Sequence, residues 1–369
     1  TPFSGGRLVS DVVGGAYTAF QPGATLLAEA MSGVPRRVPV LAQMHEFVAE
    51  YLGIPRHEFF RRPETMVPAM LEVEQRFGLD VASISYDVYN IEAEALGQPL
   101  AWTEQGMPDI DRSAPLIRDR DDLSRLCTPD FDGAECCQRV LRMHDLFRKL
   151  TGLEPSLSVC APFTLATNVR GIEQFLVDIR TEPDFARALL DRITDEVLVP
   201  WTLHQQRAFP GAGRVSAVDA TASPPIVSLE ILRDWVVPPI LRLRNACAPG
   251  VCTANWVGER FLSDPAAMLD LKLLVGPGSL LGQDPDVETL GPVFYKQYAL
   301  RREVPLVLGV GAAFLAQARP AAVAERVRQY VETGARGGRF ALYLCNLAAN
   351  TPPENVRVAV DTAHAVALG

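Results

Sequence analysis

The chain has 369 residues, of which 48% are hydrophobic and 21% charged, and its formal net charge is −9. This acidic balance argues against nucleic acid or an anionic membrane surface as a partner, and no apolar run approaches the roughly 18–20 residues of a membrane span. Seven cysteines spread over a long chain do not resemble a disulfide framework, and no signal peptide is visible, so the sequence predicts a reduced, cytoplasmic protein.

The first third of the chain begins with helical sequence and contains two short apolar runs. Residues 1–37 are amphipathic and predict an N-terminal helical extension. Residues 38–43 and 80–87 predict buried strands, and residues 63–77 predict a helix with one apolar face. Residues 98–132 are irregular and charged, so we expect an insertion there rather than a core element.

The rest of the chain alternates helical patterns with short apolar runs. Helices are expected at 133–150, 171–204, 229–247, 320–333 and 353–367, and strands at 156–160, 214–219, 250–256, 271–275 with 279–282, 305–311 and 340–345. Eight buried strands that alternate with helices predict an α/β fold, a (β/α)8 TIM-type barrel in which 1–369 form a single domain. A doubly wound open sheet is the alternative, but no GxGxxG or GxxxxGK[ST] follows the first strand.

The last strand leads into a segment with several chemical signals. It ends at Cys345 and Asn346, a thiol and an amide. Thr351 is the expected N-cap of the final helix, with Pro352 and Pro353 in the first turn and Glu354 completing a capping box. The sequence therefore predicts a reactive side chain where a buried strand meets the loop before a helix.

Polar residues recur at the carboxyl ends of the expected strands, where a barrel places its catalytic face. The residues at these ends, most of them polar, are His45, Asp87, Cys160, Asp219, Cys252, Asn255, Trp256, Gln283, Asp284, Gly309, Gly311, Cys345 and Asn346. Cys160, Cys252 and Cys345 are either buried apolar residues or thiolates that hold zinc together with an imidazole or carboxylate. The spacing of the cysteines gives no zinc motif.

Three of these residues have open interpretations. His45 is a ligand, a general base or a hydrogen-bonded core residue. Asp87 is either an acid or base at the barrel mouth or a residue that caps or pairs with neighbouring groups. In the second interpretation Glu92 and Glu94 also only cap or pair locally. Asp219 either acts on substrate or bonds the turn that begins at Thr221.

Four blocks of sequence resemble the uroporphyrinogen decarboxylase superfamily from about residue 35 onward. They are residues 80–97, 160–171, 218–225 and 343–356. The resemblance implies a distorted (β/α)8 barrel with its site at the mouth. Decarboxylases of the family have an arginine-rich segment after the first strand, where this chain reads Gln43-Met44-His45-Glu46, an exchange that disfavours a polycarboxylate porphyrinogen. Asp87 matches the family aspartate, whereas Ala220, Cys345 and Asn168 replace its serine, histidine and tyrosine.

The other branch of the superfamily is the cobalamin-dependent methyltransferases, and this chain is closest to that branch. Thiol-methylating members bind zinc through a His-x-Cys and a later cysteine. Cys345 matches the later cysteine, but the His-x-Cys position reads Cys252-Thr253-Ala254. Cys160 or His45 then replaces the missing ligand, or the site is metal-free.

The resemblance implies a methyltransferase that moves a methyl group from a small O-, N- or S-methylated compound to or from a separate corrinoid protein. Asp87 and His45 are then the proton donors. The residues expected around the substrate are Tyr86, Asn90, Glu92, Asn168, Asp219, Asn255, Trp256 and Asn346. The alternatives are a metal-independent decarboxylase or lyase that uses Asp87, and a non-catalytic binder. The oligomeric state stays open, with a homodimer as one option.

Overall fold

The computed structural model describes residues 16–84, 89–102, 107–248, 250–252 and 255–367. Tyr86 and Asp87 of the expected site lie outside these ranges, as do Thr253 and Ala254. The chain divides into two compact units. The first comprises Thr1–Ile84, Asp145–Leu153 and Gly278–Gly369, and the second comprises Ser85–His144 and Glu154–Pro277.

The first unit contains a four-stranded parallel sheet in the order β1-β9-β8-β7. The strands are β1 (Val40–Ala42), β9 (Phe340–Leu344), β8 (Leu306–Val310) and β7 (Leu280–Gln283). Leu342 pairs with Val40 on one side and with Leu308 on the other. Most of the strand residues are buried, which explains why these strands appear in the sequence as nearly continuous apolar runs.

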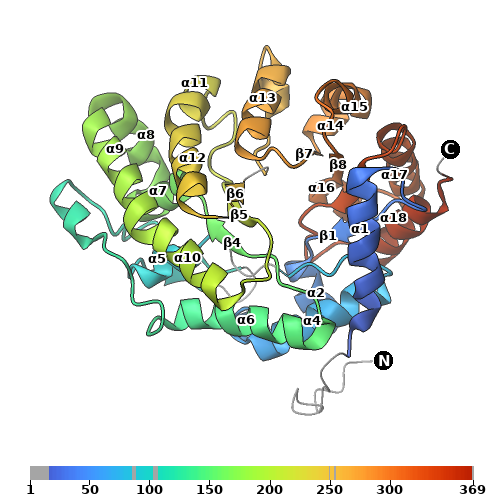
Figure 1. Ribbon diagram of the computed structural model, residues 1–369, viewed down its shortest axis with the longest axis horizontal. Helices are drawn as coiled ribbons and strands as arrows, with labels where there is room; N and C mark the ends of the chain where they lie inside the picture. Colours follow the sequence, from blue (N-terminus) through green and yellow to red (C-terminus); the bar gives the residue numbers. More distant parts are fainter. Residues whose placement is uncertain (1–15, 85–88, 103–106, 249, 253–254, 368–369) are drawn as a thin grey trace. The chain divides into compact units, whose positions relative to one another are not determined.

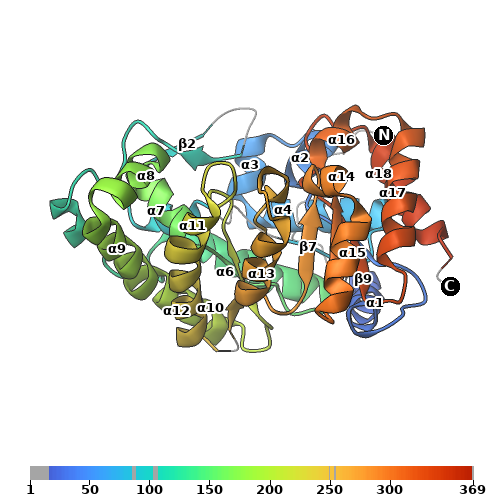
Figure 2. The same cartoon turned by 90° about the horizontal axis from the view of Figure 1, so that it is seen from above.

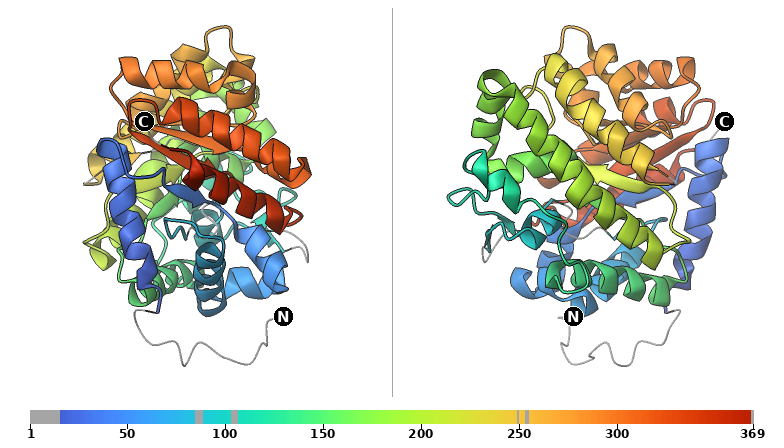
Figure 3. Two further views of the ribbon diagram at one scale, coloured as in Figure 1. Left: turned by 90° about the vertical axis from the view of Figure 1, so that its right-hand side faces the viewer. Right: turned by 60° about the vertical axis from the view of Figure 1, so that its left-hand side comes forward.

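Ten helical segments of the described chain belong to the first unit. They are η2 (Thr18–Phe20), α1 (Gln21–Ser32), α2 (His45–Leu52), α3 (Arg56–Arg61), α4 (Pro63–Arg76), α14 (Asp286–Leu290), α15 (Pro292–Arg301), α16 (Ala312–Gln317), α17 (Pro320–Gly334) and α18 (Pro353–Ala365). Helices α17 and α18 lie side by side (Figures 1 and 3), and α15 runs beside β7 (Figure 2). Alternation of strand and helix therefore continues through the carboxyl-terminal third of the chain.

The second unit contains the parallel sheet β4-β5-β6, formed by Ser158–Cys160, Val215–Val218 and Val251–Cys252. A small antiparallel pair, β2 (Leu100–Ala101) and β3 (Asp109–Ile110), lies within the expected irregular insertion. The helical segments are α5 (Ile91–Ala95), η3 (Asp121–Arg125), α7 (Pro162–Arg170), α8 (Ile172–Thr181), α9 (Pro183–Arg192), η4 (Ile193–Leu198), α10 (Val199–Ala208), α11 (Leu229–Ile231), η5 (Leu232–Val236), α12 (Val237–Ala246), η6 (Glu259–Phe261) and α13 (Pro265–Val275). Helix α6 (Glu135–Thr151) supplies residues to both units.

Two sequence predictions of local structure are wrong. Residues 271–275 are not a strand but the last turns of α13, because Asp264 caps that helix by accepting hydrogen bonds from the N–H groups of Ala266 and Ala267. Thr351 does not cap α18: the cap position falls on Pro352, without a side-chain hydrogen bond. A residue that precedes proline is pushed toward extended backbone, so Pro352 stays extended and α18 begins at Pro353, where the expected range 353–367 begins.

The expected second strand is not formed in its described part. Among residues 80–84, the N–H of Asp80 bonds the carbonyl of Val40 at 3.1 Å, but no strand is assigned there. The carboxylate of Asp80 also accepts from the N–H of Val40 and from His364 on α18. Side-chain bonds therefore hold this segment beside β1. In the described ranges, no helix is long and apolar enough to cross a bilayer.

Candidate functional site

Asp219 follows β5 directly and is the centre of a buried polar cluster in the second unit. Its Oδ1 accepts hydrogen bonds from the backbone N–H and the hydroxyl of Thr164, at 3.2 and 2.7 Å. Its Oδ2 accepts from the indole Nε1 of Trp256 at 3.0 Å. Burial raises the pKa of Asp219 to about 6, although these bonds oppose that rise. Because three donors hold the carboxylate, it joins the start of α7 to the segment that follows β6.

Two more threonines extend this cluster over the turn after β5. The hydroxyl of Thr221 lies 2.8 Å from that of Thr164 and 3.1 Å from that of Thr167. The N–H of Thr221 also donates to the Thr164 hydroxyl, at 3.2 Å. One interpretation of the sequence was that Asp219 bonds the turn that begins at Thr221. In the structure the link is indirect, because Thr164 bonds both the Asp219 carboxylate and Thr221.

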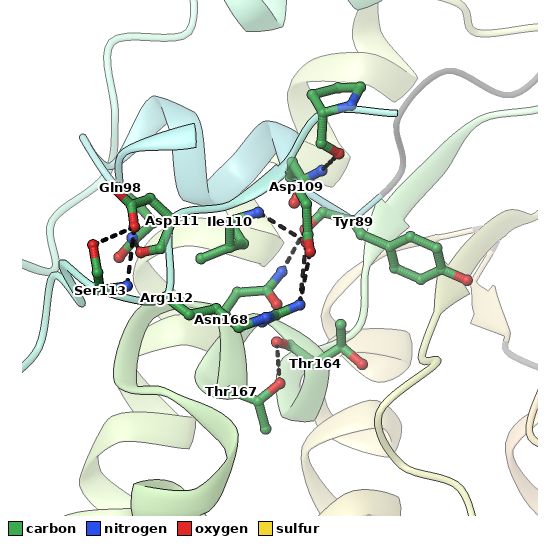
Figure 4. A network of polar contacts seen from close by, with 12 residues as sticks. Tyr89, Gln98, Asp109, Ile110, Asp111, Arg112, Ser113, Thr164, Thr167 and Asn168 are labelled. Carbon is green, nitrogen blue, oxygen red and sulfur yellow. Dashed lines mark hydrogen bonds and ion pairs between the residues drawn. The ribbon is translucent and has the colours of Figure 1, made fainter. Parts of the chain in front are cut away.

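Asn255 connects the cluster to Tyr89, a residue that the sequence analysis did not select. The amide oxygen of Asn255 accepts from the N–H of Asp219 at 3.0 Å, and its Nδ2 lies 3.4 Å from the Tyr89 hydroxyl. Nδ2 of Asn168 donates to the Tyr89 carbonyl at 2.6 Å. Figure 4 shows the Tyr89 ring directed away from Asn168. The structure thus brings together four residues expected around the substrate, Asn168, Asp219, Asn255 and Trp256, and adds Tyr89.

Asn90 and Glu92 hold neighbouring backbone in place. Nδ2 of Asn90 donates to the Pro108 carbonyl at 2.8 Å, and Oε1 of Glu92 accepts from the N–H of Cys160 at 3.1 Å. All three of Asn90, Glu92 and Cys160 are buried. These hydrogen bonds connect α5 to the insertion and to β4, and they position the segment that carries Tyr89.

A second polar cluster follows the strands of the first unit, around Asp284 and Cys345. Oδ2 of Asp284 accepts from the N–H of Gly311 and from Arg326, both at 3.1 Å, and its Oδ1 accepts from the hydroxyl of Tyr330. Burial raises the pKa of Asp284 against these bonds. The sequence drew attention to Asp284 and Gly311 at strand ends but gave no sign of Arg326 or Tyr330, which come from α17.

Cys345 lies directly against the backbone of β8. A Cβ atom added to Gly309 would be 2.3 Å from its sulfur, so glycine leaves the space that the thiol fills. Burial and the nearby charge of Asp284 raise the pKa of the Cys345 thiol well above its ordinary value. At neutral pH the side chain is therefore a protonated thiol rather than a thiolate.

His45 and Asn346 complete the expected residues of the first unit. His45 is the first residue of α2, is buried, and has its ring centroid 6.4 Å from that of Phe60. Asn346 is exposed and has a φ of 44°, a left-handed conformation that asparagine tolerates better than most residues. The chain therefore turns sharply just after Cys345.

Cys252 is the last residue of β6, but it is not level with the end of the neighbouring strand β5. It pairs with Ser216, two residues before β5 ends at Val218, and it lines a cavity together with Arg214, the residue before β5. Among the described residues, no three His, Cys, Asp or Glu side chains form a group that could hold a metal ion. The described donors therefore do not fit the zinc centre that the cysteines suggested, and we assign no ligand role to Cys160, Cys252 or Cys345.

Comparison with known proteins identifies relatives. Residues 22–366 match the family model described as Uroporphyrinogen decarboxylase (URO-D). A methylated-thiol–coenzyme M methyltransferase from Methanosarcina mazei is 31% identical over 169 residues, which are 45% of this chain and 44% of that protein. The chain thus matches less than half the length of this curated relative.

A solved structure gives the fold. A methyltransferase from Methanosarcina mazei superimposes with a TM-score of 0.70 over 94% of this chain and 98% of that one, at 19% identity. At this identity the likeness shows the fold alone. Together with the family match it confirms the expected α/β fold, a barrel of the uroporphyrinogen decarboxylase type.

Proposed function

The chain belongs to the uroporphyrinogen decarboxylase family, and on this basis we propose that it is a methyltransferase. In this proposal it moves a methyl group between a small O-, N- or S-methylated compound and a corrinoid protein. One observation carries the proposal: the relative named as a methylated-thiol–coenzyme M methyltransferase is 31% identical over 169 residues. The donor, the corrinoid partner and a homodimeric state remain proposals.

The first strand supports methyl transfer over decarboxylation of a porphyrinogen. In the sequence, Gln43 occupies the segment where the decarboxylases have arginines. In the structure its Oε1 accepts a hydrogen bond from the hydroxyl of Tyr343 at 2.9 Å. The neighbouring Glu46 carries a negative charge, and its Oε1 lies 3.4 Å from Arg56. The amide of Gln43, which is hydrogen-bonded to Tyr343, and the carboxylate of Glu46 therefore do not provide the cluster of positive charges that a porphyrinogen with several carboxylates would need.

Methyl transfer breaks the bond between the methyl carbon and a heteroatom, and the electron pair stays with the heteroatom. A bound corrinoid supplies the methyl acceptor or donor. The protein must hold the methyl carbon in line and make the leaving heteroatom less basic, which protonation achieves. We propose Asp87 and His45 as proton donors. The cluster of Asp219, Trp256 and Asn255 is proposed to fix the pocket wall from which Tyr89 projects.

No metal step is included in this proposal. The described side chains do not gather into a zinc ligand set. The chain's own groups therefore carry the proposed proton transfer.

The proposal is tested by supplying free cob(I)alamin to the purified protein under reducing, anaerobic conditions. A panel of methylated thiols, methoxy compounds and methylamines serves as donors, and methylcobalamin formation is followed by visible absorption. We expect turnover with one donor class and loss of turnover in Asp87→Asn. The proposed role of His45 as a proton donor is tested in parallel with His45→Gln.

Two other results would replace the proposal. Release of carbon dioxide without corrinoid, abolished in Asp87→Asn, would make the protein a lyase. Saturable binding of a donor with no turnover, unaffected by Asp87→Asn, would make it a binding protein. Mass spectrometry of the demethylated product distinguishes methyl transfer from oxidation of the corrinoid.

A further inference from the structure

A cavity of about 420 Å³ lies in the second unit at the amino ends of β5 and β6. Arg214 immediately precedes β5 and Gly250 immediately precedes β6, and both line it. Asp219 and Asn255 follow the same two strands at their other ends. Arg214 and Asp219 are therefore separated by the whole of β5, and nothing in the proposed methyl transfer uses the cavity.

The lining of this cavity is basic. Its residues are Arg214, Arg244, Asn245, Cys247, Ala248, Gly250, Val251, Cys252 and Pro277, with no carboxylate among them. Two guanidinium groups without a lining acid are notable in a chain of net charge −9. Each guanidinium offers a planar fork of N–H donors, which matches the oxygens of a carboxylate or phosphate.

The two arginines differ in how they are held. Nη1 of Arg244 donates to the carbonyls of Leu274 and Val275 at the end of α13, at 2.9 and 3.4 Å. These bonds fix the guanidinium beside the cavity. Arg214 is exposed and has no ion pair or hydrogen bond with the described residues. Arg244 therefore lines the cavity with an oriented guanidinium group. The N–H groups of Arg214 are available to solvent or to a ligand.

Cys252, which also lines the cavity, is influenced by both charges. Its side chain is half-buried, and burial raises the pKa of its thiol. Arg214 and Arg244 both act in the opposite direction on that pKa, so both guanidinium groups lie within electrostatic range of the sulfur. Cys247, by contrast, is buried, with its sulfur directed to the Val199 carbonyl at 3.9 Å.

We propose that this cavity is a binding site for a small oxyanion group, a phosphate, sulfonate or carboxylate, held between Arg214 and Arg244 with Asn245 at its edge. Its volume lies at the lower end of the range of about 300–1,000 Å³ that is common for small-molecule sites. This site is distinct from the proposed methyl-transfer site, and its test does not depend on activity.

Cys252 serves as the reporter in this test. The purified full chain is alkylated with iodoacetate, an anion, or with iodoacetamide, which is neutral, and the modification of each cysteine is measured by peptide mass spectrometry. Both reagents react with the same thiolate, so their rate ratio cancels the thiol pKa and reports the local potential. Cys127, which is exposed, is the internal reference.

We expect inorganic phosphate to slow alkylation of Cys252 but not of Cys127, compared with chloride at equal ionic strength. In Arg214→Gln the ratio of iodoacetate to iodoacetamide rates at Cys252 should fall about three- to fivefold, as the loss of one exposed charge implies. Arg244→Lys keeps the charge and removes the fork, and should lose phosphate protection. Arg328→Gln, an exposed arginine on α17, is the control for net charge.

Parallel arms with acetate and methanesulfonate show which oxyanion the site prefers, and protection by any of them supports the proposal. Equal protection by chloride and by every oxyanion at matched ionic strength would overturn it. An unchanged rate ratio in Arg214→Gln, in a protein with the circular dichroism of the wild type, would overturn it as well.

Discussion

The indole N–H of Trp256 donates to Oδ2 of Asp219 at 3.0 Å, and neither side chain has accessible surface. The bond joins the residue that follows β5 to the segment that follows β6. A buried carboxylate that lacks donors is costly, so the indole and Thr164 together make this position tolerable. Within the proposed function, Asp219 is therefore a positioning residue, proposed to act on substrate through Asn255 and the turn at Thr221.

Trp256→Phe should destabilise the second unit. The change removes one donor to a buried carboxylate and leaves a small cavity, so we expect a loss of about 2–4 kcal/mol in the free energy of unfolding. Urea denaturation followed by circular dichroism measures it. Trp235→Phe is the matched control, because that indole packs under Arg187. Equal losses in the two variants would contradict a specific role for the bond to Asp219.

Asp219→Asn should change how stability depends on pH. Burial raises the folded-state pKa of Asp219 to about 6, above the unfolded value near 4, so the folded protein binds the proton more tightly. The stability that this group contributes is complete below about pH 4 and is lost as pH rises through 6, with a difference of about 3 kcal/mol. Subtracting the unfolding free energies of Asp219→Asn from those of the wild type between pH 4 and 7.5 isolates this slope. A difference that does not change with pH would refute the assignment.

Gly309→Ala should displace Cys345. The new methyl group would lie 2.3 Å from the sulfur, which no real contact allows, so β8 or the thiol must move. We expect a loss of about 1–3 kcal/mol from overpacking, measured as a shift of the urea midpoint. Adding Cys345→Ala removes the sulfur and should recover part of this loss. Gly213→Ala, which meets no atom within 4 Å, is the neutral control.

Lys272→Met should be more damaging than the double variant Lys272→Met/Glu259→Leu. Nζ of Lys272 and Oε1 of Glu259 form an ion pair whose side chains are 2% and 1% exposed. Removing one partner leaves a buried charge and should cost about 3–5 kcal/mol, whereas replacing both with apolar residues should be close to neutral. Thermal unfolding of the three proteins checks this order. A double variant as unstable as the single one would show that the pair is not coupled.

The strand positions were predictable because buried parallel strands are short apolar runs bounded by turns. The predicted strands at 305–311 and 340–345 correspond closely to β8 and β9. The error at 271–275 shows the limit of this signal, since a run of Leu, Lys, Leu, Leu and Val suits a buried helix equally well. The cue that decides it is Asp264 before Pro265, an N-cap followed by the first helical residue.

The site was predictable in its residue types but not in their distances. The expected strand ends supplied Asp219, Asn255 and Trp256, the family resemblance supplied Asn168, and the structure brings the four together. The sequence also selected Cys252, because thiols at expected strand ends suggest ligands. Although Cys252 ends β6, it pairs with Ser216, two residues before β5 ends at Val218, so it is not level with Asp219. Register between strands is a tertiary property, and spacing along one chain does not contain it.

The pairing of Val40 with Leu342 has a consequence for how this protein is made. β1 is synthesised about 300 residues before its neighbour β9. During that interval β1 has no β9 to pair with, whereas all three strands of the β4-β5-β6 sheet have already emerged. The nascent chain must therefore keep an apolar strand from wrong partners until β9 has emerged, which makes β1 a segment that chaperones would protect.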